Sequence, residues 1–524
     1  MAKMRKWATA DSETNPFDGT EVKPFIWAFY DGEICEIFEG PGATKNFINY
    51  IKEFNGIIYA HNGGRFDWMF SEIISAIDDA KPLMLINGRI AKARIGKCEI
   101  RDSWLCLPDK LSAFAKDDFD YTWLLPENRD KRRAEIISYI TSDVKNLYEP
   151  LARFFEDNGQ ALTQAGASLK DWENMGGNVR RYGPHHDAKF RPYYFGGRVE
   201  VFNYANGEPG PFNIYDVNSA YPYAMTFQHP LGTRYYQTDD LSDIKGGSFW
   251  TVIAKSRGAL PIRKKDGGVD FPNDNEPREY KVTGWELLCG IETGTLDILS
   301  GIGLVPMETE SMRPFVEKCV KIKEAAEKAG DKTGRLLAKL KMNSCYGKYA
   351  ANPESYKEYI LDPRADTEEA GGWCFDRLLT TPDGPRGLFW RPAQRAQFFD
   401  VALAASITGH ARANLWRAIN SCEGVIYCDT DSVLCQNGAK LDRGGKLGQW
   451  DDEGEIARAW IAGKKLYALE KTGGGYKTAS KGVKATPAEI KRVCAGEVVL
   501  IKNDAPTMKI DGRQIFQERH IKIT

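Results

Sequence analysis

Four acidic side chains in the first 143 residues stand at spacings that would bring them together. Asp11 and Glu13 are two apart, so a strand would point both to one face. Asp67 ends an Asn-Gly-Gly-Arg-Phe-Asp string, and Asp143 follows Tyr139 by four positions, which places those two on one helix face. Carboxylates held together raise one another's pKa, and divalent cations remove that penalty. The spacing predicts a site for two Mg²⁺ or Mn²⁺ ions that cleaves phosphodiesters, with the Tyr139 hydroxyl orienting the attacking water.

A second acidic set lies further along the chain. Asp216 comes near the end of the apolar stretch 213–217, and the string Tyr-Cys-Asp-Thr-Asp-Ser carries Asp429 and Asp431. On an extended segment these two acids project to the same side, with Thr430 opposite. Acids that follow an apolar strand are costly to bury unless a cation accompanies them. The sequence therefore predicts a second site for divalent ions.

Lysine and tyrosine side chains at a helical spacing form a third group. On a helix, Lys339, Asn343, Tyr346 and Gly347 fall at i, i+4, i+7 and i+8 and share one face. A lysine in that position binds a triphosphate as a point charge, and a tyrosine there can pack against a base pair. Upstream, Lys323 is either a second phosphate-binding lysine or an ordinary solvated side chain.

The segments that must position these residues indicate more than one domain, because 524 residues exceed one ordinary core. The first 155 residues alternate strand-like and helix-like patterns, and the chain becomes strand-rich again from Tyr193. The ranges expected to form particular elements are a helix over 133–156, a linking segment over 156–192, two helices over 311–350 broken at 329–331, an inserted hairpin over 362–388, a helix over 396–420 and a strand–turn–strand over 424–435.

Composition narrows the class of protein. Apolar residues make up 42% and charged residues 27%, and no apolar run approaches the roughly 20 residues that span a bilayer. The 11 cysteines include no C-x-x-C pair, which favours reduced thiols and a cytoplasmic location. The net charge is -1, yet residues 461–524 hold 13 Lys or Arg against 6 Asp or Glu. A basic C-terminal end suits phosphate backbones, and a solvated lysine-rich surface is the equal alternative.

The ordered motifs resemble one family. D-x-E, N-x-x-x-F-D and Y-x-x-x-D look like the exonuclease motifs of proofreading family B polymerases. D-x-x-S-x-Y-P after residue 215, K-x-x-x-N-S-x-Y-G after 338 and Y-C-D-T-D-S after 426 look like polymerase motifs A, B and C. With the Y-x-G-G element at 194–197 and K-x-Y at 465–467, the order is most similar to protein-primed family B DNA polymerases, especially those of tectiviruses.

The resemblance implies an α/β and α+β multidomain fold. A ribonuclease H-like 3′→5′ exonuclease domain would precede a right-hand polymerase of palm, fingers and thumb with two insertions. The implied boundaries are 1–155 for the exonuclease domain, 156–192 for a linker, 193–226 for the start of the palm, 227–310 for terminal-protein region 1, 311–352 for the fingers, 353–388 for the terminal-protein region 2 hairpin, 389–478 for the rest of the palm and 479–524 for the thumb.

The resemblance also assigns roles to single residues. Asp216, Val217, Asp429 and Asp431 would hold two catalytic ions, while Tyr221 would stack under the incoming sugar and exclude a 2′-hydroxyl. Lys116 would support exonuclease catalysis. The residues implied to bind nucleotide are Val217, Tyr221, Lys323, Lys339, Asn343 and Tyr346. The residues implied to bind DNA are Asn62, Phe66, Tyr194, Gly196, Gly197, Lys465, Tyr467 and Lys481.

The implied activity is template-directed addition of dNTPs to a primer 3′-hydroxyl by two-metal phosphoryl transfer, with proofreading and strand displacement. The implied partners are template and primer DNA and a terminal protein that supplies the priming hydroxyl, with the enzyme a monomer or a heterodimer with that protein. A primer-independent polymerase of the same family is the nearest alternative. A stand-alone nuclease would leave the second acidic set unused, and a non-catalytic scaffold would not need seven metal-binding carboxylates.

Overall fold

The computed structural model describes residues 4–79, 81–114, 117–352, 356–362, 372–393 and 399–524. Lys116, to which a supporting catalytic role is assigned above, lies outside the described residues. Among the described residues, no helix combines the length and the hydropathy needed to cross a bilayer.

A mixed seven-stranded sheet forms the N-terminal domain, in the order β3-β2-β1-β4-β7-β6-β5. Strand β4 runs parallel to β1 and β7, and the remaining neighbours pair antiparallel. The strands are β1 (Trp7–Thr14), β2 (Pro24–Tyr30), β3 (Cys35–Glu39), β4 (Ile57–Ala60), β5 (Met84–Ile86), β6 (Arg89–Ile95) and β7 (Cys98–Asp102).

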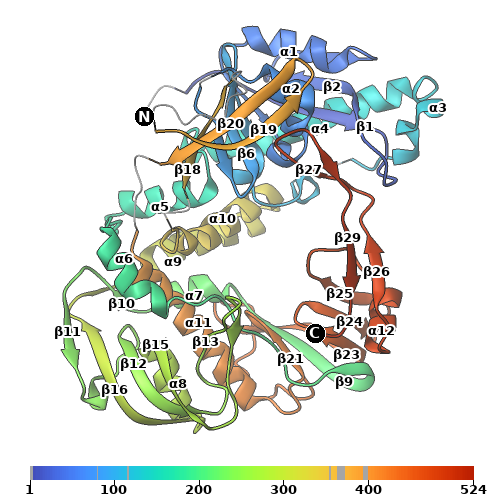
Figure 1. Cartoon of the computed structure of the whole chain (residues 1–524). Helices are drawn as coiled ribbons and strands as arrows, with labels where there is room; N and C mark the ends of the chain where they lie inside the picture. The colour runs from blue at the N-terminus through green and yellow to red at the C-terminus, as the bar shows by residue number, and fades with distance from the viewer. Residues whose placement is uncertain (1–3, 80, 115–116, 353–355, 363–371, 394–398) are drawn as a thin grey trace.

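Helices cover both faces of this sheet because its strands are apolar on both sides. In β1, Ala8 and Ala10 face the core that holds α1 (Ala43–Glu53) and α2 (Ser71–Ala76), whereas Trp7 faces α4 (Arg133–Asn158). The long helix predicted from residue 133 is confirmed. A mixed sheet between helical layers is the arrangement expected of the ribonuclease H-like domain (Figure 1).

A second seven-stranded sheet, antiparallel throughout, lies at the opposite end of the molecule in the order β25-β24-β23-β9-β22-β21-β8. Helices α7 (Ala220–Met225) and α11 (Val401–Ser421) pack beside it, and the predicted strand–turn–strand is confirmed as β21 and β22. The strands are β8 (Val199–Val201), β9 (Ala205–Val217), β21 (Tyr427–Asp429), β22 (Ser432–Cys435), β23 (Trp450–Gly463), β24 (Leu466–Lys471) and β25 (Tyr476–Ser480).

Residues 227–310 form a layer of their own against helix α11 (Figure 1). Four antiparallel strands in the order β11-β16-β12-β15 carry helix α8 (Gly284–Glu292) on one side. The strands of the region are β10 (His229–Pro230), β11 (Tyr235–Thr238), β12 (Phe249–Ser256), β13 (Ile262–Arg263), β14 (Val269–Asp270), β15 (Pro277–Thr283), β16 (Leu296–Pro306) and β17 (Thr309–Glu310).

The predicted helix pair is confirmed as α9 (Arg313–Lys328) and α10 (Lys332–Ser344). The range 156–192, expected only to link domains, contains α5 (Gln164–Asn174) and α6 (Pro184–Phe190). Helix α5 packs on the pair, and Asp171 accepts from Lys318 at 2.8 Å and pairs with Lys341 at 3.1 Å. The segment is therefore a structural support for the two helices as well as a connection.

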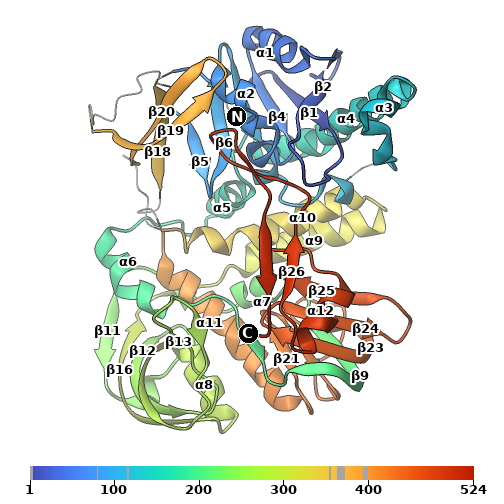
Figure 2. The ribbon, with the colours of Figure 1, turned by 45° about the vertical axis from the view of Figure 1, so that its right-hand side comes forward.

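An inserted three-stranded sheet, β18 (Lys357–Asp362), β20 (Gly384–Pro392) and β19 (Cys374–Thr381), leans on the N-terminal domain (Figure 2). Leu361, Leu379 and Leu388 join that domain's apolar core, and the buried Arg386 donates to the Ile74 carbonyl at 2.9 Å. The insert thus reaches Pro392, beyond the expected end at residue 388.

The C-terminal segment runs from the second sheet to the N-terminal domain (Figure 2). Helix α12 (Pro487–Cys494) packs on the second sheet, while the paired strands β26 (Val499–Lys502) and β29 (Glu518–Ile521), and β27 (Thr507–Met508) and β28 (Gln514–Ile515), extend towards the first. Gln514 exchanges two hydrogen bonds with the backbone of Val22, at 2.8 and 2.6 Å, so this arm is anchored to the N-terminal domain.

A buried histidine in α11 makes the stability of the fold depend on pH. The His410 ring lies against Phe227 with centroids 4.1 Å apart, and burial, followed by the neighbouring His229 and Arg417, lowers the pKa of His410 to about 3. Unfolded, the residue takes a proton below about pH 6.5, whereas folded it stays neutral, so stability present above pH 6.5 is lost as the pH falls.

We expect the wild type to lose about 2 kcal/mol relative to His410→Phe between pH 7.5 and pH 5. The measurement is urea unfolding of both proteins at pH 7.5 and pH 5, because taking the difference removes contributions from other groups. A wild-type-minus-variant difference that stays constant with pH would contradict the assignment.

Candidate active sites

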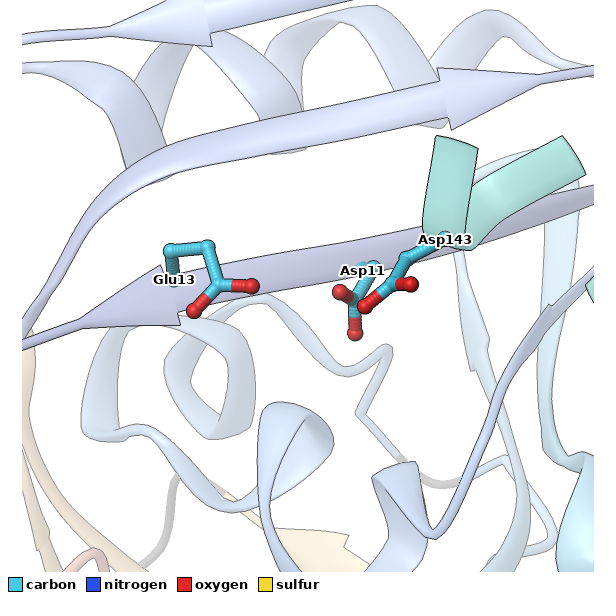
Figure 3. A group of neighbouring side chains, drawn as sticks. All are labelled: Asp11, Glu13 and Asp143. Atoms are coloured by element: carbon cyan, nitrogen blue, oxygen red, sulfur yellow. The ribbon is translucent and has the colours of Figure 1, made fainter. Parts of the chain in front are cut away.

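Three carboxylates meet on the α4 side of the first sheet. Asp11 and Glu13 project from β1, Asp143 projects from α4, and one oxygen from each lies within 4.8 Å of the others (Figure 3). The period of two along β1 puts both acids on the face that α4 crosses. Carboxylate oxygens at this separation suit hard divalent cations, so these residues fit the predicted metal site.

The fourth predicted ligand, Asp67, does not belong to this group of three as the described side chains stand. It begins the single turn Asp67–Met69, and its Oδ1 accepts a hydrogen bond of 2.5 Å from the Ser12 hydroxyl. Burial raises the pKa of Asp67 to about 7. The structure brings together three of the four acids, and a ligand role for Asp67 stays a prediction.

Tyr139 lies one helical turn before Asp143 on α4, as the spacing predicted. Its hydroxyl is 3.1 Å from that of Tyr121, and its ring stacks on Phe119 with centroids 3.9 Å apart. Burial, the hydrogen bond to Tyr121 and the charges of Asp143 and Glu13 all raise the pKa of Tyr139. The hydroxyl therefore keeps its proton and can act as a donor beside the carboxylates.

A cavity of about 1080 Å³ opens beside Asp11. It is lined by Asn62 and Phe66 from the N-terminal domain, by residues of β18 and β19, and by the tip of the C-terminal arm at 505–510. The predicted DNA-binding residues of this domain thus lie next to the first carboxylate site. Lys357 and Arg377, which also line the cavity, were missed by sequence reasoning because they come from the insert and carry no local pattern.

The second carboxylate site lies where β9, β22 and β21 meet. Asp216 pairs with Ser432 across the sheet, and the Val217 amide donates to the Asp431 carbonyl at 2.8 Å, which joins the strand end to the turn. Burial, then the charges of Asp431 and Glu453, raises the pKa of Asp216 to about 7. A bound cation would therefore stabilise the charged forms of Asp216 and Asp431, whose pKa values are raised.

Two further charged groups border this second site. Lys465 Nζ lies 2.9 Å from Asp429 Oδ1, so this lysine, which is predicted to bind DNA, also neutralises part of the charge of the acidic site. Glu453 on β23 was missed by sequence reasoning, although it helps to raise the pKa of Asp216 and pairs with Lys477 on β25. Its position follows from strand pairing and not from any spacing within the chain.

The tyrosines of the two nucleotide motifs meet beside the acids. Tyr221 on α7 stacks on Tyr346, with ring centroids 4.3 Å apart and planes at 18°. Helix α10 ends at Ser344, so the expectation that one helix face continues through Tyr346 and Gly347 is wrong. Those two residues lie in the tighter turn Tyr346–Lys348, which swings the Tyr346 ring towards Tyr221.

The predicted phosphate-binding side chains lie on the helix pair. Lys339 is exposed on α10, and its charge acts to lower the pKa of Asp216, which places it within electrostatic reach of the second site. Asn343 is half-buried near the end of α10, and Lys323 is half-buried on α9. A nucleotide-binding role for all three stays a prediction.

The stacked tyrosines lead to a test of sugar selection. We expect Tyr221→Val to lower the preference for dCTP over CTP by about 100-fold, because the missing ring leaves space where a 2′-hydroxyl would lie. Single-nucleotide insertion kinetics measure the ratio of the two kcat/KM values. Tyr346→Phe, which keeps the stacked ring, is the matched control, and an unchanged ratio in Tyr221→Val would rule out a steric gate at this residue.

The two glycines of the Y-x-G-G element differ in their surroundings. The Cβ position of Gly196 has no atom of a described residue within 4 Å, which suits close approach of a ligand. A Cβ on Gly197 would instead meet the Thr430 side chain at 2.7 Å. Gly197 therefore makes room for the turn that carries Asp429 and Asp431, and a contact of the two glycines with DNA stays a prediction.

A buried ion pair holds the backbone of the Y-x-G-G element in place. Arg412 of α11 donates to the carbonyls of Phe195 and Gly196 at 2.6 and 2.9 Å and pairs with Glu286 of α8 at 2.8 Å. Sequence reasoning missed both residues, because they stand 126 positions apart and only the fold brings them together.

The remaining predicted DNA-binding residues surround the second site. Tyr194 packs in the cluster that holds Tyr221 and Tyr346, and the Tyr467 ring meets that of Tyr427 edge-on at 5.2 Å. The Lys481 amide donates to the Lys465 carbonyl at 3.0 Å. The structure thus places Tyr194 beside the stacked tyrosines and places Tyr467 and Lys481 near Asp429, and the contact of all three with DNA stays a prediction.

Comparison with known proteins fits this arrangement. The family "DNA polymerase type B, organellar and viral" matches residues 126–372. A DNA-directed DNA polymerase of Enterobacteria phage PRD1 is 34% identical over 561 residues, covering 99% of this chain and 98% of the relative. A DNA polymerase of Bacillus phage Nf is 24% identical and covers 91% of this chain and 90% of its own length.

Solved structures agree at the level of the fold. The phi29 DNA polymerase complexed with single-stranded DNA matches with a TM-score of 0.74 and 18% identity, covering 99% of this chain and 100% of the other. Its ternary complex with primer-template DNA and incoming nucleotide matches with a TM-score of 0.72 and 19% identity, at the same coverage. With the full-length likeness to the PRD1 enzyme, these findings confirm the family that the motifs predicted: the chain belongs to the organellar and viral type B DNA polymerases and is a DNA-directed DNA polymerase.

Proposed function

We propose that this polymerase holds two catalytic centres, one for extension of a primer and one for 3′→5′ removal of a terminal nucleotide. The observation that carries the proposal is the presence of two separate carboxylate groups. Asp11, Glu13 and Asp143 gather on the N-terminal sheet, whereas Asp216, Asp429 and Asp431 gather on the second sheet. Two acidic sites on two sheets fit two metal-dependent reactions on one DNA strand.

Both groups fit two Mg²⁺ ions each, with Mn²⁺ as a substitute, because the donors are hard carboxylate oxygens. Bound ions would neutralise developing charge and lower the pKa of the attacking hydroxyl or water. At the second site, burial and mutual repulsion raise the pKa values of Asp216 and Asp431. At the first site, Tyr139 keeps its proton and can donate a hydrogen bond to a water.

In extension, the side chains of this polymerase bind and orient the nucleotide. The stacked Tyr221 and Tyr346 form a wall for the sugar and base, and Lys339 attracts the triphosphate. In proofreading, Asn62 and Phe66 line the cavity that leads to Asp11 and bind the single-stranded end. The basic arm after residue 479 follows the duplex.

We further propose protein-primed, strand-displacing replication of a linear viral DNA in the cytoplasm of a host cell. The layer formed by residues 227–310 supports this, because it has its own sheet and helix and presents a separate surface for a terminal protein. The insert β18–β20 packs on the N-terminal domain and lines the cavity beside Asp11 together with the tip of the C-terminal arm, where it can enclose DNA. The enzyme would act as a monomer or as a heterodimer with that protein.

Covalent labelling tests the priming proposal. The enzyme is mixed with the candidate terminal protein of the same genome, template DNA, Mg²⁺ and one labelled dNTP at a time. We expect the label to stay attached to the terminal protein on a denaturing gel. With Asp431→Ala in place of the wild type, we expect no labelled terminal protein. Synthesis that starts equally well without the terminal protein would instead support a primer-independent enzyme, and label that never joins protein would overturn protein priming.

A further inference from the structure

The turn between Asp429 and Asp431 has an unusual backbone. Thr430 adopts φ +60, the left-handed region that β-branched residues rarely enter. The Asp431 amide donates to the Asp429 carbonyl at 2.6 Å, and the Thr430 hydroxyl donates to Asp429 Oδ1 at 3.0 Å. Such a conformation persists only where the surroundings determine it, so neighbouring residues must hold the turn in place.

The segment just before β8 supplies that support. The Thr430 amide donates to the Arg198 carbonyl at 2.6 Å, which continues the antiparallel pairing of Val199 with Asp429. On the adjacent residue, a Cβ added to Gly197 would lie 2.7 Å from Thr430 Cγ2 and 2.9 Å from its Oγ1. Arg198 therefore binds the turn through its backbone carbonyl. Gly197 fits next to Thr430 only because it lacks a side chain.

The Arg198 side chain holds the backbone of residues 197–198 in place through its own buried contacts. It is 1% exposed, and its guanidinium lies between the rings of Phe271 and Trp416, 4.0 and 4.1 Å from their centroids. It donates to the Gly258 carbonyl at 2.7 Å and to Glu200 at 2.8 Å. Gly258 and Phe271 belong to the layer formed by residues 227–310, so the Arg198 side chain connects this layer to the backbone that holds the turn.

We propose that Gly197 and Arg198 are positioning residues that set the Asp429–Thr430–Asp431 turn for metal binding, with Arg198 anchored by the layer of residues 227–310. The inference rests on the proposed use of Asp429 and Asp431 as metal ligands. It assigns to the Y-x-G-G-R segment a task in metal placement, beyond its predicted contact with DNA. Neither residue touches the reacting atoms, because both act through Thr430.

Arg198→Lys tests the anchor. Lysine keeps the charge but has no planar group to fill the space between Phe271 and Trp416, and it does not reproduce the directed donors to Gly258 and Glu200. We expect kcat for nucleotide addition to fall about 10- to 100-fold and the half-saturating Mg²⁺ concentration for extension to rise, with KM for dNTP little changed. Degradation of single-stranded DNA, at a site on the other sheet, should keep its rate and Mg²⁺ dependence.

Gly197→Ala tests the turn without disturbing the buried arginine. We expect the same loss of kcat and the same shift in Mg²⁺ dependence, because the methyl group pushes on Thr430. A double-mutant cycle with Thr430→Gly supplies the matched comparison. In the T430G background, where the opposing side chain is gone, adding Gly197→Ala should cost little more, whereas independent effects would multiply.

The outcomes separate this inference from the proposed function. If Asp431→Ala retains extension, the metal-ligand assignment itself fails. If Asp431→Ala loses extension but Arg198→Lys and Gly197→Ala leave kcat and Mg²⁺ dependence unchanged, only the positioning role fails. Equal loss of both activities together with a lower unfolding temperature in both variants would also overturn it, since the residues would then be supporting the fold as a whole.

Discussion

Asp431→Ala is expected to lower primer extension by at least about 1000-fold, or about 4 kcal/mol of transition-state stabilisation, while degradation of single strands continues at the wild-type rate. Asp431 lies in the turn after β21, where burial and the neighbouring Asp429 raise its pKa and where its backbone carbonyl accepts from Val217. Removing the carboxylate takes away one charge from the cation site but leaves that backbone hydrogen bond. The loss should therefore fall on catalysis and not on folding.

The measurement pairs two assays on one preparation of enzyme. A labelled primer on a template reports extension, and the same primer alone reports degradation. Asp452→Ala is the matched control, because Asp452 is an exposed acid on the same sheet that pairs with Tyr215 and so lies on the opposite face from Asp216. Extension by Asp431→Ala at a rate close to that of Asp452→Ala would remove Asp431 from the catalytic site.

Parts of both sites could be predicted because their residues are close in the chain. The period of two predicted that Asp11 and Glu13 share a face, and the helical period predicted that Tyr139 and Asp143 do. The structure bears out both geometries. The fold class followed from the same patterns together with the order of the motifs, and the full-length likeness to phi29 DNA polymerase bears it out.

Contacts between distant segments could not be predicted in the same way. Arg412 and Glu286 look like ordinary charged residues in their helices, and only the packing of α11 on α8 makes them a buried pair. Arg198 was part of a recognised string, yet its partners Phe271 and Trp416 come from two other regions. A spacing describes one strand or helix, whereas these interactions depend on how several elements pack.

Local patterns also failed where a regular element ends. The expected helix face through Tyr346 assumed that α10 continues, but the helix stops at Ser344 and the following turn redirects the ring. The N-x-x-x-F-D string predicted Asp67 as a ligand, which stays a prediction, but it did not show that Ser12 donates a hydrogen bond to this carboxylate. At both positions the direction of the side chain depends on the turn that carries it.

The second large effect is expected for the degradation of single-stranded DNA, at the carboxylates of the N-terminal sheet. Asp11→Ala should lower degradation of single-stranded DNA by about 1000-fold and leave the rate of correct nucleotide addition unchanged. Asp11 lies in the middle of β1, and its neighbours Ala10 and Ser12 point away from the acid cluster into the opposite side of the sheet. Truncating Asp11 therefore removes a third of the three-carboxylate group without opening the apolar core.

A primer with a mismatched 3′ end makes this loss visible during synthesis. The wild type should remove the mismatched nucleotide and then extend, whereas Asp11→Ala should stall or extend past the mismatch with the wrong nucleotide retained. Glu36→Ala, which changes an exposed acid on β3 of the same sheet, should behave as the wild type. If Asp11→Ala still trims the mismatch at the control rate, the carboxylates on the first sheet do not perform proofreading. If it also loses correct extension, the two sites are not separate, because one substitution would then disable both sheets.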